Sequence, residues 1–357
     1  MSAVQPEQTL ANEPLAAVFR RLIAATGPIS LMHYMGEANA RYYARKDPLG
    51  SAGDFITAPE ISQMFGELIG LWLADIWTRA GQPGPIHYVE LGPGRGTLAA
   101  DALRVAKRHG LEPQVHLVET SAALRGLQRA AVPNAQWHHD LATIPTTGPV
   151  LIVGNEFLDA LPVRQLVKTA DGWRERMVIP EGDRFACVAG QQPMDAAVPD
   201  DRRMAAPGTI LETCPGAAAT LHEVSARLID QGGAALFIDY GHSEPRAGST
   251  LQAVRAHQKV DPFINPGEAD LTALVDFATL AQIARSHGVK WLGTAPQGQW
   301  LKHLGIEARA AALAAAAPAH AAALQAALTR LTSDDQMGQL FKVMGLAAPG
   351  WPDGGGF

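Results

Sequence analysis

The sequence has few cysteines, and this scarcity limits the chemistry that it can carry. Only two of its 357 residues are cysteines, Cys187 and Cys214. Neither has a neighbour at the spacing that metal ligands use, so we expect no metal site. The spacing leaves a disulfide between the two cysteines open but gives it no support. A reducing compartment is therefore the default expectation.

An excess of basic residues is missing, and so is any long apolar run. The formal net charge is −6 and no dense cluster of lysines and arginines occurs, so we expect no broad electrostatic binding to nucleic acid. No stretch reaches the roughly 18 uninterrupted apolar residues of a membrane-spanning helix. The alanine-rich tract at 308–328 comes nearest, but Pro318 and His320 interrupt it. We therefore expect no membrane span.

The start of the chain does not resemble a secretion signal. Residues 1–30 include Glu7 and Glu13 and contain no long apolar core, whereas a signal peptide needs such a core behind a basic start. Together with the small number of cysteines, this favours a cytoplasmic location. The length allows one large α/β domain with additions or two domains.

A glycine-rich turn is the most informative stretch of the chain. Residues 86–91 are typical of a buried strand, and residues 97–109 have the composition of a helix. Between them lie Gly92, Gly94 and Gly96. Glycines at alternate positions let a ligand approach the backbone, and the following helix offers its unpaired N–H groups. The same glycines also fit a turn that only lets the helix pack tightly on the strand.

Two carboxylates favour a particular ligand for this turn. Glu90 directly precedes it, and Glu119 ends the next predicted strand, residues 115–119, where a carboxylate usually binds ribose hydroxyls. The G-x-G-x-G spacing differs from the dinucleotide pattern, and Glu90 would repel a pyrophosphate. A cationic ligand with a ribose fits better. S-adenosylmethionine has a sulfonium, an ammonium and a ribose.

Polar residues follow two further predicted strands. Asp140 ends the short strand 136–140 and is a candidate for the adenine amine, although a capping or loop aspartate fits equally well. The continuously apolar strand 149–153 is followed by Asn155, Glu156 and Asp159. Because ligands of open α/β sheets lie beyond the carboxyl ends of the strands, these three are the best candidates for substrate chemistry.

The pair His138-His139 and the loop at 42–63 invite functional interpretations of different strength. No third ligand lies at useful spacing from the histidines, so a metal is not favoured. The loop is rich in charge and glycine, and Thr57 with Glu60 forms a capping-box pattern ahead of a helix with an apolar stripe. Such a loop fits either a functional segment or a structural turn.

The remaining patterns predict the organisation of the chain. Residues 163–189 have β-hairpin character, with turns at 171–172 and 181–183, and residues 163–214 are expected to cover part of the site as an insertion. The sheet resumes at 234–242 and ends with strands at 289–292 and 341–344, separated by a helical excursion. The predicted segments are 1–80 (helical region and covering loop), 81–162 (first part of the core), 163–214, 215–350 (rest of the core) and a flexible tail, 351–357.

Five blocks of the sequence resemble the MidA-like family, which includes a mitochondrial arginine methyltransferase that assists assembly of respiratory complex I. The blocks are residues 50–63, 90–96, 155–162, 239–242 and 260–263, and the resemblance spans nearly the whole chain. It implies a class I methyltransferase that uses S-adenosylmethionine, with a Rossmann-like seven-stranded α/β sheet. It also implies an acceptor arginine in a complex I subunit. A homodimer is one expectation for the oligomeric state, which the sequence leaves open.

The resemblance also implies roles for individual residues. Gly92, Gly94 and Gly96 would line the methionine part of the cofactor and Glu119 would bind the ribose, while the block 53–57 would close over the cofactor. The full set of cofactor-binding candidates is Asp54, Phe55, Thr57, Glu90, Gly92, Gly94, Gly96, Glu119, Asp140, Leu141 and Asn155. Asn155 and Glu156 would face the acceptor.

Our mechanistic hypothesis concerns the acceptor. Glu156 would bind its guanidinium, with Asp159 or Asp54 as a second carboxylate. For Glu156, a helix cap or an ion pair with Arg164 is the structural alternative. A different class of function is also open, in which the protein binds S-adenosylmethionine and acts as an assembly chaperone. A nicotinamide enzyme is disfavoured by the glycine spacing.

Overall fold

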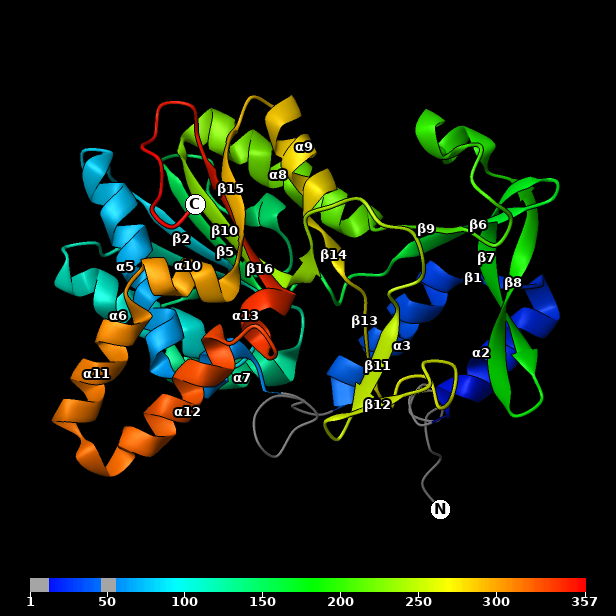
Figure 1. Cartoon of the computed structure of the whole chain (residues 1–357), viewed down its shortest axis with the longest axis horizontal. Helices are drawn as coiled ribbons and strands as arrows, with labels where there is room; N and C mark the ends of the chain where they lie inside the picture. The colour runs from blue at the N-terminus through cyan, green and yellow to red at the C-terminus, as the bar shows by residue number, and fades with distance from the viewer. Residues whose placement is uncertain (1–12, 46–55) are drawn as a thin grey trace, which may run out of the picture. The chain divides into compact units, whose positions relative to one another are not determined.

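The computed structural model describes residues 13–45 and 56–357, and these residues form two compact units (Figure 1). The parallel-sheet unit holds described residues from 56 to 159, 217–245 and 274–357, and the antiparallel-sheet unit holds described residues up to 45, 160–216 and 246–273. Each unit is assembled from three separate stretches of the chain, because strands far apart in the sequence pair with one another.

The parallel-sheet unit is built around one sheet, which has eight strands among the described residues. Across the sheet the order is β4 (Gln136–His138), β3 (Gln114–Val118), β2 (His87–Leu91), β5 (Val150–Asn155), β10 (Gly233–His242), β16 (Phe341–Ala347) and β15 (Lys290–Pro296). The first five run parallel, β16 runs antiparallel to both of its neighbours, and the short β14 (Val275–Asp276) pairs in parallel with the last two residues of β10. Apart from β14, the sheet has the seven strands that were predicted.

The central strands are buried along their whole length, as their apolar sequences predicted. Every residue of β2 and β5 is buried, because helices cover both faces of a parallel sheet. The helices of this unit are α4 (Ala58–Ile61), α5 (Gln63–Arg79), α6 (Thr97–Arg108), α7 (Ala122–Ala131), most of α8 (Pro215–Gln231), α9 (Phe277–Ser286), α10 (Gln297–His303), α11 (Ile306–Ala316), α12 (Ala321–Thr332) and α13 (Met337–Leu340). The last four form the predicted helical excursion, and α11 and α12 lie side by side in Figure 1.

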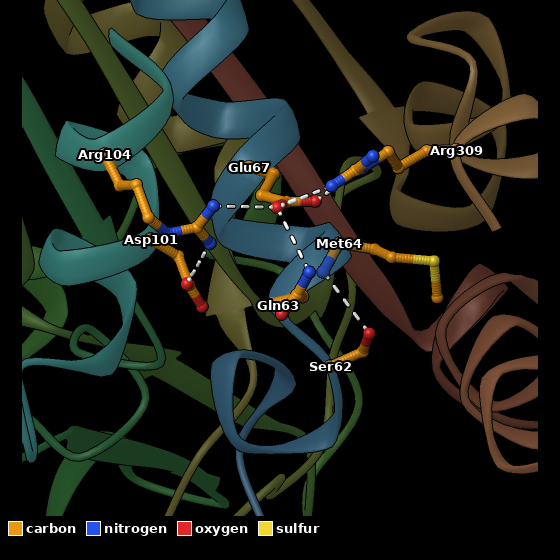
Figure 2. A network of polar contacts seen from close by, with 7 residues as sticks. All are labelled: Ser62, Gln63, Met64, Glu67, Asp101, Arg104 and Arg309. Carbon is orange, nitrogen blue, oxygen red and sulfur yellow. Dashed lines mark hydrogen bonds and ion pairs between the residues drawn. The ribbon is translucent and has the colours of Figure 1, made fainter. Parts of the chain in front are cut away.

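A buried carboxylate connects three helices of this unit (Figure 2). Glu67 of α5 is 3% exposed and accepts hydrogen bonds from Arg104 of α6 at 3.1 Å and from Arg309 of α11 at 2.7 Å. Burial raises the pKa of Glu67, but the bonds from the two arginines outweigh it and hold the pKa below its ordinary value. The carboxylate therefore fixes α6, which follows the glycine turn, against α5 and α11.

The C-terminal segment packs against the parallel-sheet unit, whereas the sequence predicted a flexible tail. The indole N–H of Trp72 donates to the carbonyl of Gly355 at 3.0 Å. The ring of Phe357 fills a space beside Gly345 that a Cβ atom would occupy, since such an atom would lie 2.4 Å from the ring. The glycine of β16 thus creates the slot that holds the last residue.

The antiparallel-sheet unit contains two sheets and two helices among its described residues. Its elements are α2 (Leu15–Thr26), β1 (Ile29–Ser30), α3 (Leu31–Arg45), β6 (Arg164–Thr169), β7 (Gly172–Glu181), β8 (Arg184–Pro193), β9 (Ile210–Thr213), β11 (Gln252–Arg255), β12 (Gln258–Val260) and β13 (Asp270–Thr272). The hairpin turns at 171–172 and 181–183 lie where the sequence predicted them. Ser30 caps α3, since its hydroxyl accepts a hydrogen bond from the His33 N–H, and this helix extends to Arg45. Whether this unit covers part of the site stays a prediction.

Candidate active site

Polar side chains form a row at one edge of the parallel sheet. Along each strand, alternate residues point to the same face. On the face covered by α5 and α6, four strands have an apolar residue in the core and a polar residue two positions later. These pairs are Tyr88 and Glu90 of β2, Leu117 of β3 and Glu119 just after it, Val153 and Asn155 of β5, and Ile238 and Tyr240 of β10. Because four neighbouring strands contribute, the sheet brings together candidates that lie far apart in the sequence.

The three glycines of the turn all adopt conformations that other residues avoid. Gly92, Gly94 and Gly96 have φ values of 62°, 55° and 84°, in the left-handed region that favours glycine. Gly96 is the N-cap of α6, so the first N–H groups of that helix have no partner within it. A Cβ atom on Gly92 would lie 2.9 Å from the ring of Phe157. The glycines therefore allow the left-handed backbone of the turn, and Gly92 and Gly96 also allow other parts of the protein to pack closely against it.

Glu90 lies deeper than the sequence suggested. It is 2% exposed, and its carboxylate accepts a hydrogen bond from the Tyr88 hydroxyl at 2.6 Å. Burial raises the pKa of Glu90 to about 8, against the opposing effect of that hydrogen bond. The group is therefore mostly protonated at neutral pH in the absence of a ligand, and a nearby cation would favour its ionised form.

Glu119 is held by the residues around the glycine turn. Its carboxylate accepts from Ser121 N–H at 2.7 Å and from the Gln128 amide at 3.3 Å, and burial raises its pKa. Gln128 also donates to the carbonyl of Gly94 at 2.7 Å and accepts from the Trp137 indole. No local pattern in the sequence predicts this role, because Gln128 is one polar residue on an amphipathic helix. The two oxygens of a fixed, partly exposed carboxylate suit the two hydroxyls of a ribose.

Asp140 and Leu141 lie one strand further along. Asp140 is exposed and precedes a single 3-10 turn without capping it through its side chain, so the predicted binding role and the loop alternative both remain. Leu141 is buried. His138 belongs to a chain of histidines: His87 Nδ1 lies 3.0 Å from His116 Nε2, and His116 Nδ1 lies 3.0 Å from His138 Nε2. Both ring nitrogens of His138 are engaged, since Nδ1 contacts Thr143.

The side chains of Asn155 and Glu156 lie next to each other and can accept further hydrogen bonds. The Asn155 amide donates to Glu156 Oε1 at 3.2 Å, and the N–H of Ala58 donates to the same oxygen at 2.8 Å. Within the described residues, the buried Oδ1 atom of Asn155 has no hydrogen-bond partner. An unpaired buried acceptor is costly and asks for a donor from elsewhere.

Glu156 also has a strained backbone. Its φ is 49°, which costs on the order of 1–3 kcal/mol for a residue other than glycine. In an extended strand, consecutive side chains would point to opposite faces. The left-handed turn places Glu156 beside Asn155. Burial, followed by the charge of Asp239, raises the pKa of Glu156 to about 7, although the bond from Ala58 opposes the shift.

Asp239 fixes the turn that follows β5. It is 1% exposed, and its Oδ2 atom accepts from the N–H groups of Phe157, Leu158 and Asp159 at 3.2, 2.8 and 3.2 Å. Burial raises its pKa to about 7. Asp159 therefore lies in a turn whose backbone is anchored, while its side chain is partly exposed. In the sequence, Asp239 ends an apolar strand and begins the block 239–242, but no local pattern indicates that its carboxylate anchors this turn.

The segment at 57–62 connects to the glycine turn through Glu60. The predicted capping box is wrong, because the Thr57 side chain makes no cap bond and Glu60 instead accepts from the Thr97 hydroxyl and lies 3.6 Å from Arg95. The expected single helix is broken at Ser62, whose extended backbone separates α4 from α5. Asp54 and Phe55 lie outside the described residues.

Comparisons with known proteins agree on one family. Residues 68–295 match the Methyltransf_28 family, described as S-adenosyl-L-methionine-dependent methyltransferases. The protein arginine methyltransferase NDUFAF7 of Xenopus tropicalis is 37% identical, covering 90% of this chain and 82% of that protein. The human protein of the same name is 36% identical, covering 84% and 76%.

A solved structure matches nearly the whole chain. It is a COG1565 superfamily member from Burkholderia thailandensis bound to S-adenosyl-homocysteine, with a TM-score of 0.80, 29% identity and coverage of 97% of this chain and 95% of that one. A native structure of such a protein from the same organism gives a TM-score of 0.79 and 31% identity.

These matches confirm the resemblance found in the sequence and the predicted cofactor. They contradict the expected cytoplasmic location, because the names of the curated relatives place those proteins in mitochondria. In the described part of the chain, no helix combines the length and the apolar character that crossing a bilayer requires.

Proposed function

We propose that this chain, which belongs to the family of S-adenosylmethionine-dependent methyltransferases, methylates the guanidinium group of an arginine in a protein. S-adenosylmethionine is its methyl donor. Relatives that are 36–37% identical are named as protein arginine methyltransferases. The observation that carries the proposal is the pair of adjacent acceptors at the end of β5, the unsatisfied Oδ1 of Asn155 and the carboxylate of Glu156.

The chemistry of this pair matches a guanidinium. Guanidinium has five N–H donors and no acceptor, and it forms bidentate hydrogen bonds with carboxylates. Asn155 Oδ1 and Glu156 present acceptors on the same side of the sheet edge, at the end of the buried strand β5. A bound guanidinium would donate a hydrogen bond to Asn155 Oδ1. Its positive charge would also offset the negative charge of Asp239, which makes ionisation of Glu156 less favourable. Asp159 is the second carboxylate in this proposal.

The residues around the glycine turn would hold the donor. Gly92, Gly94 and Gly96 would allow close approach to its methionine part, Glu119 would bind the ribose, and Glu90 would lie near its positive charge. S-adenosylmethionine supplies a methyl group activated by a sulfonium. The protein mainly contributes proximity and alignment, since the transfer is an in-line displacement.

Glu156 would also handle the released proton. Acceptor and product each carry one positive charge, so transfer of a cationic methyl group releases one proton from the guanidinium nitrogen. A carboxylate with a pKa of about 7 can take this proton near neutral pH and pass it to water. Binding and proton removal then converge on one side chain.

Substitution of Glu156 tests this function. Arginine peptides are incubated with the purified protein and S-adenosylmethionine, and methylarginine is measured by mass spectrometry. We expect Glu156→Gln to lower kcat by about 100-fold or more, the usual contribution of a positioned base, with unchanged affinity for S-adenosylmethionine. Glu112→Gln is the matched control, because Glu112 is exposed and its ion pair among the described residues is with Lys107. Near wild-type turnover by Glu156→Gln would remove Glu156 from the mechanism.

We further propose that the acceptor protein is a subunit of respiratory complex I. The support is the resemblance of five sequence blocks to a family with a member that assists complex I assembly. Mass spectrometry of arginine methylation in the complex, from cells with and without this protein, tests the assignment. If a folded Gly94→Val protein still supported assembly, the chaperone role would replace methylation as the main activity. The expected homodimer stays a prediction that light scattering can check.

A further inference from the structure

We propose that Tyr240 and Phe341 form an aromatic wall of the acceptor subsite, against which the flat face of the acceptor guanidinium packs. The inference rests on the proposed function and adds to it a determinant of specificity for planar cations. Neither residue is among the sequence-derived site candidates. The geometry of three adjacent strands, β5, β10 and β16, carries the argument.

The two rings are neighbours at the carboxyl edge of the sheet. Tyr240 and Phe341 are directly paired across the antiparallel strands β10 and β16. Their ring centroids lie 5.7 Å apart with an angle of 48° between the ring planes. Such tilted pairs are favourable contacts, so each ring fixes the orientation of the other.

The rings lie on the same face of the sheet as the polar pair of β5. Ile238 pairs with Asn155 across β10 and β5, and Glu156 N–H donates to the Ile238 carbonyl at 2.9 Å. Tyr240 follows Ile238 by two residues, so its side chain shares that face. From strand spacing and rise, the Cα atoms of Tyr240 and Asn155 lie roughly 8 Å apart. A guanidinium spans such a gap between a carboxylate and a ring.

The exposure of the rings distinguishes them from ordinary core residues. Their apolar neighbours two positions away on this face, Ile238 and Val343, are fully buried, whereas Tyr240 and Phe341 are both partly exposed. Within the described residues, the Tyr240 hydroxyl makes no hydrogen bond. The buried core therefore ends in an aromatic surface open toward the edge where Asn155 and Glu156 have bonding capacity to spare.

The chemistry of this surface selects for a planar cation. Guanidinium stacks on aromatic faces while its N–H groups in the plane bond a carboxylate. The aromatic wall would pack against the flat face of the guanidinium, and Asn155 with Glu156 would accept hydrogen bonds from the N–H groups at its edge. A lysine ammonium has no flat face and would lose the stacking contact, so the wall would favour arginine over lysine.

The test measures acceptor binding separately from donor binding. We expect Tyr240→Leu and Phe341→Leu each to raise KM for an arginine peptide by about tenfold, in the range of a desolvated cation–π contact. The Kd for S-adenosylmethionine should stay unchanged, and Tyr240→Phe should retain a KM close to wild type. Trp291→Leu is the matched control, because Trp291 is an aromatic residue of the edge strand β15, 39% exposed.

Replacement of Phe341 by fluorinated phenylalanines keeps the test sharp if the leucine variants fold poorly. Fluorine weakens the negative face of the ring with little change in shape, so KM should rise with the number of fluorines. A KM independent of fluorination, or a Tyr240→Leu protein with wild-type KM, overturns the wall and leaves the proposed function intact. Wild-type protein that transfers methyl groups to no arginine peptide overturns both.

Discussion

The two halves of the parallel sheet differ in how completely their polar groups are paired. In the half that we propose to bind the cofactor (the cofactor half), formed by β2, β3 and β4, Gln128 bonds both Glu119 and the Gly94 carbonyl. In the half that we propose to bind the acceptor (the acceptor half), formed by β5, β10 and β16, Asn155 Oδ1 has no partner among the described residues and Glu156 has a left-handed backbone. In both halves, these polar groups lie at the carboxyl ends of the parallel strands.

This difference indicates how the work of binding is divided. A site whose side chains are already held loses little conformational freedom on binding, which suits a cofactor bound in every turnover. Unpaired acceptors and strain persist only where the surrounding structure enforces them. Here Ala58 N–H and the turn anchored by Asp239 do so. These features suit the acceptor binding that we propose for this half of the sheet.

The largest effect is expected from disturbing the glycine turn of the cofactor half. Gly92→Val adds a branched side chain at a φ of 62°, where a Cβ atom would lie 2.9 Å from the Phe157 ring. We expect the Kd for S-adenosylmethionine to rise by about 100-fold, equivalent to ~3 kcal/mol, as measured by calorimetry.

Gly110→Val is the control for backbone strain. Gly110 has a φ of 82° but no atom within 4 Å of the built Cβ. It should lose stability and keep its affinity for the cofactor. Equal losses of affinity in both variants would mean that backbone strain in general, and not the local geometry of the glycine turn, explains the effect.

Removing the anchor of the acceptor half should come next in size. Asp239→Ala leaves the N–H groups of Phe157, Leu158, Asp159 and Tyr240 without their acceptor. We expect a loss of about 3 kcal/mol in the free energy of unfolding, since each orphaned buried group costs on the order of 1 kcal/mol or more. Urea unfolding measures it.

A single capping aspartate provides the comparison. Asp276 accepts from the Thr279 N–H as the N-cap of α9, so Asp276→Ala should cost only about 1 kcal/mol. If the two variants lost the same stability, the turn after β5 would not depend on Asp239 in the way that its bonds indicate.

Protonation of Glu90 should couple cofactor binding to pH. Its pKa of about 8 is raised above the ordinary value, so the free protein holds a proton there at neutral pH, and a cationic ligand favours its release. Affinity should therefore increase as pH rises toward 8, by at most about tenfold per pH unit.

Calorimetry in buffers of different ionisation enthalpy detects the released proton. The ammonium group of the cofactor also titrates, so the comparison with Glu90→Gln isolates the share of the protein. An unchanged pH dependence in that variant would place the proton elsewhere and would weaken the contrast between the halves.

The smallest effect on the site is expected from a region outside both halves. Glu67→Gln weakens the bonds from Arg104 and Arg309, which are partly exposed and can turn to water. We expect a loss of about 1–2 kcal/mol in the free energy of unfolding and unchanged binding of both ligands.

The pH dependence of this loss has a defined sign. Because the pKa of Glu67 is lowered, its stabilisation is present above the ordinary carboxyl pKa and is lost as pH falls through the folded value. The gap between wild type and Glu67→Gln should therefore close in acid. Thermal unfolding at several pH values measures it, and a constant gap would argue against the ion pairs.

Much of the sheet could be predicted from the sequence. Strands 86–91, 149–153 and 234–242 are marked by apolar runs, and the glycine turn by its spacing, because these signals are local. The predicted capping box is wrong because Glu60 accepts a hydrogen bond from Thr97 and pairs with Arg95. Both residues lie more than thirty positions further along the chain. The roles of the Gln128 and Asp239 side chains could not be predicted for the same reason, since their hydrogen-bond partners are distant in the sequence.

The sequence alone determined the class of fold, the glycine turn and the family, since alternation, turn residues and motifs are properties of neighbouring positions. Tertiary structure decided the rest. It placed Glu156 beside Asn155 through a left-handed backbone, anchored the turn with Asp239, and set Tyr240 and Phe341 next to each other at the same edge. Only the pairing of β5, β10 and β16 brings these residues together, because the burial and hydrogen bonds that fix them depend on strands far apart in the chain.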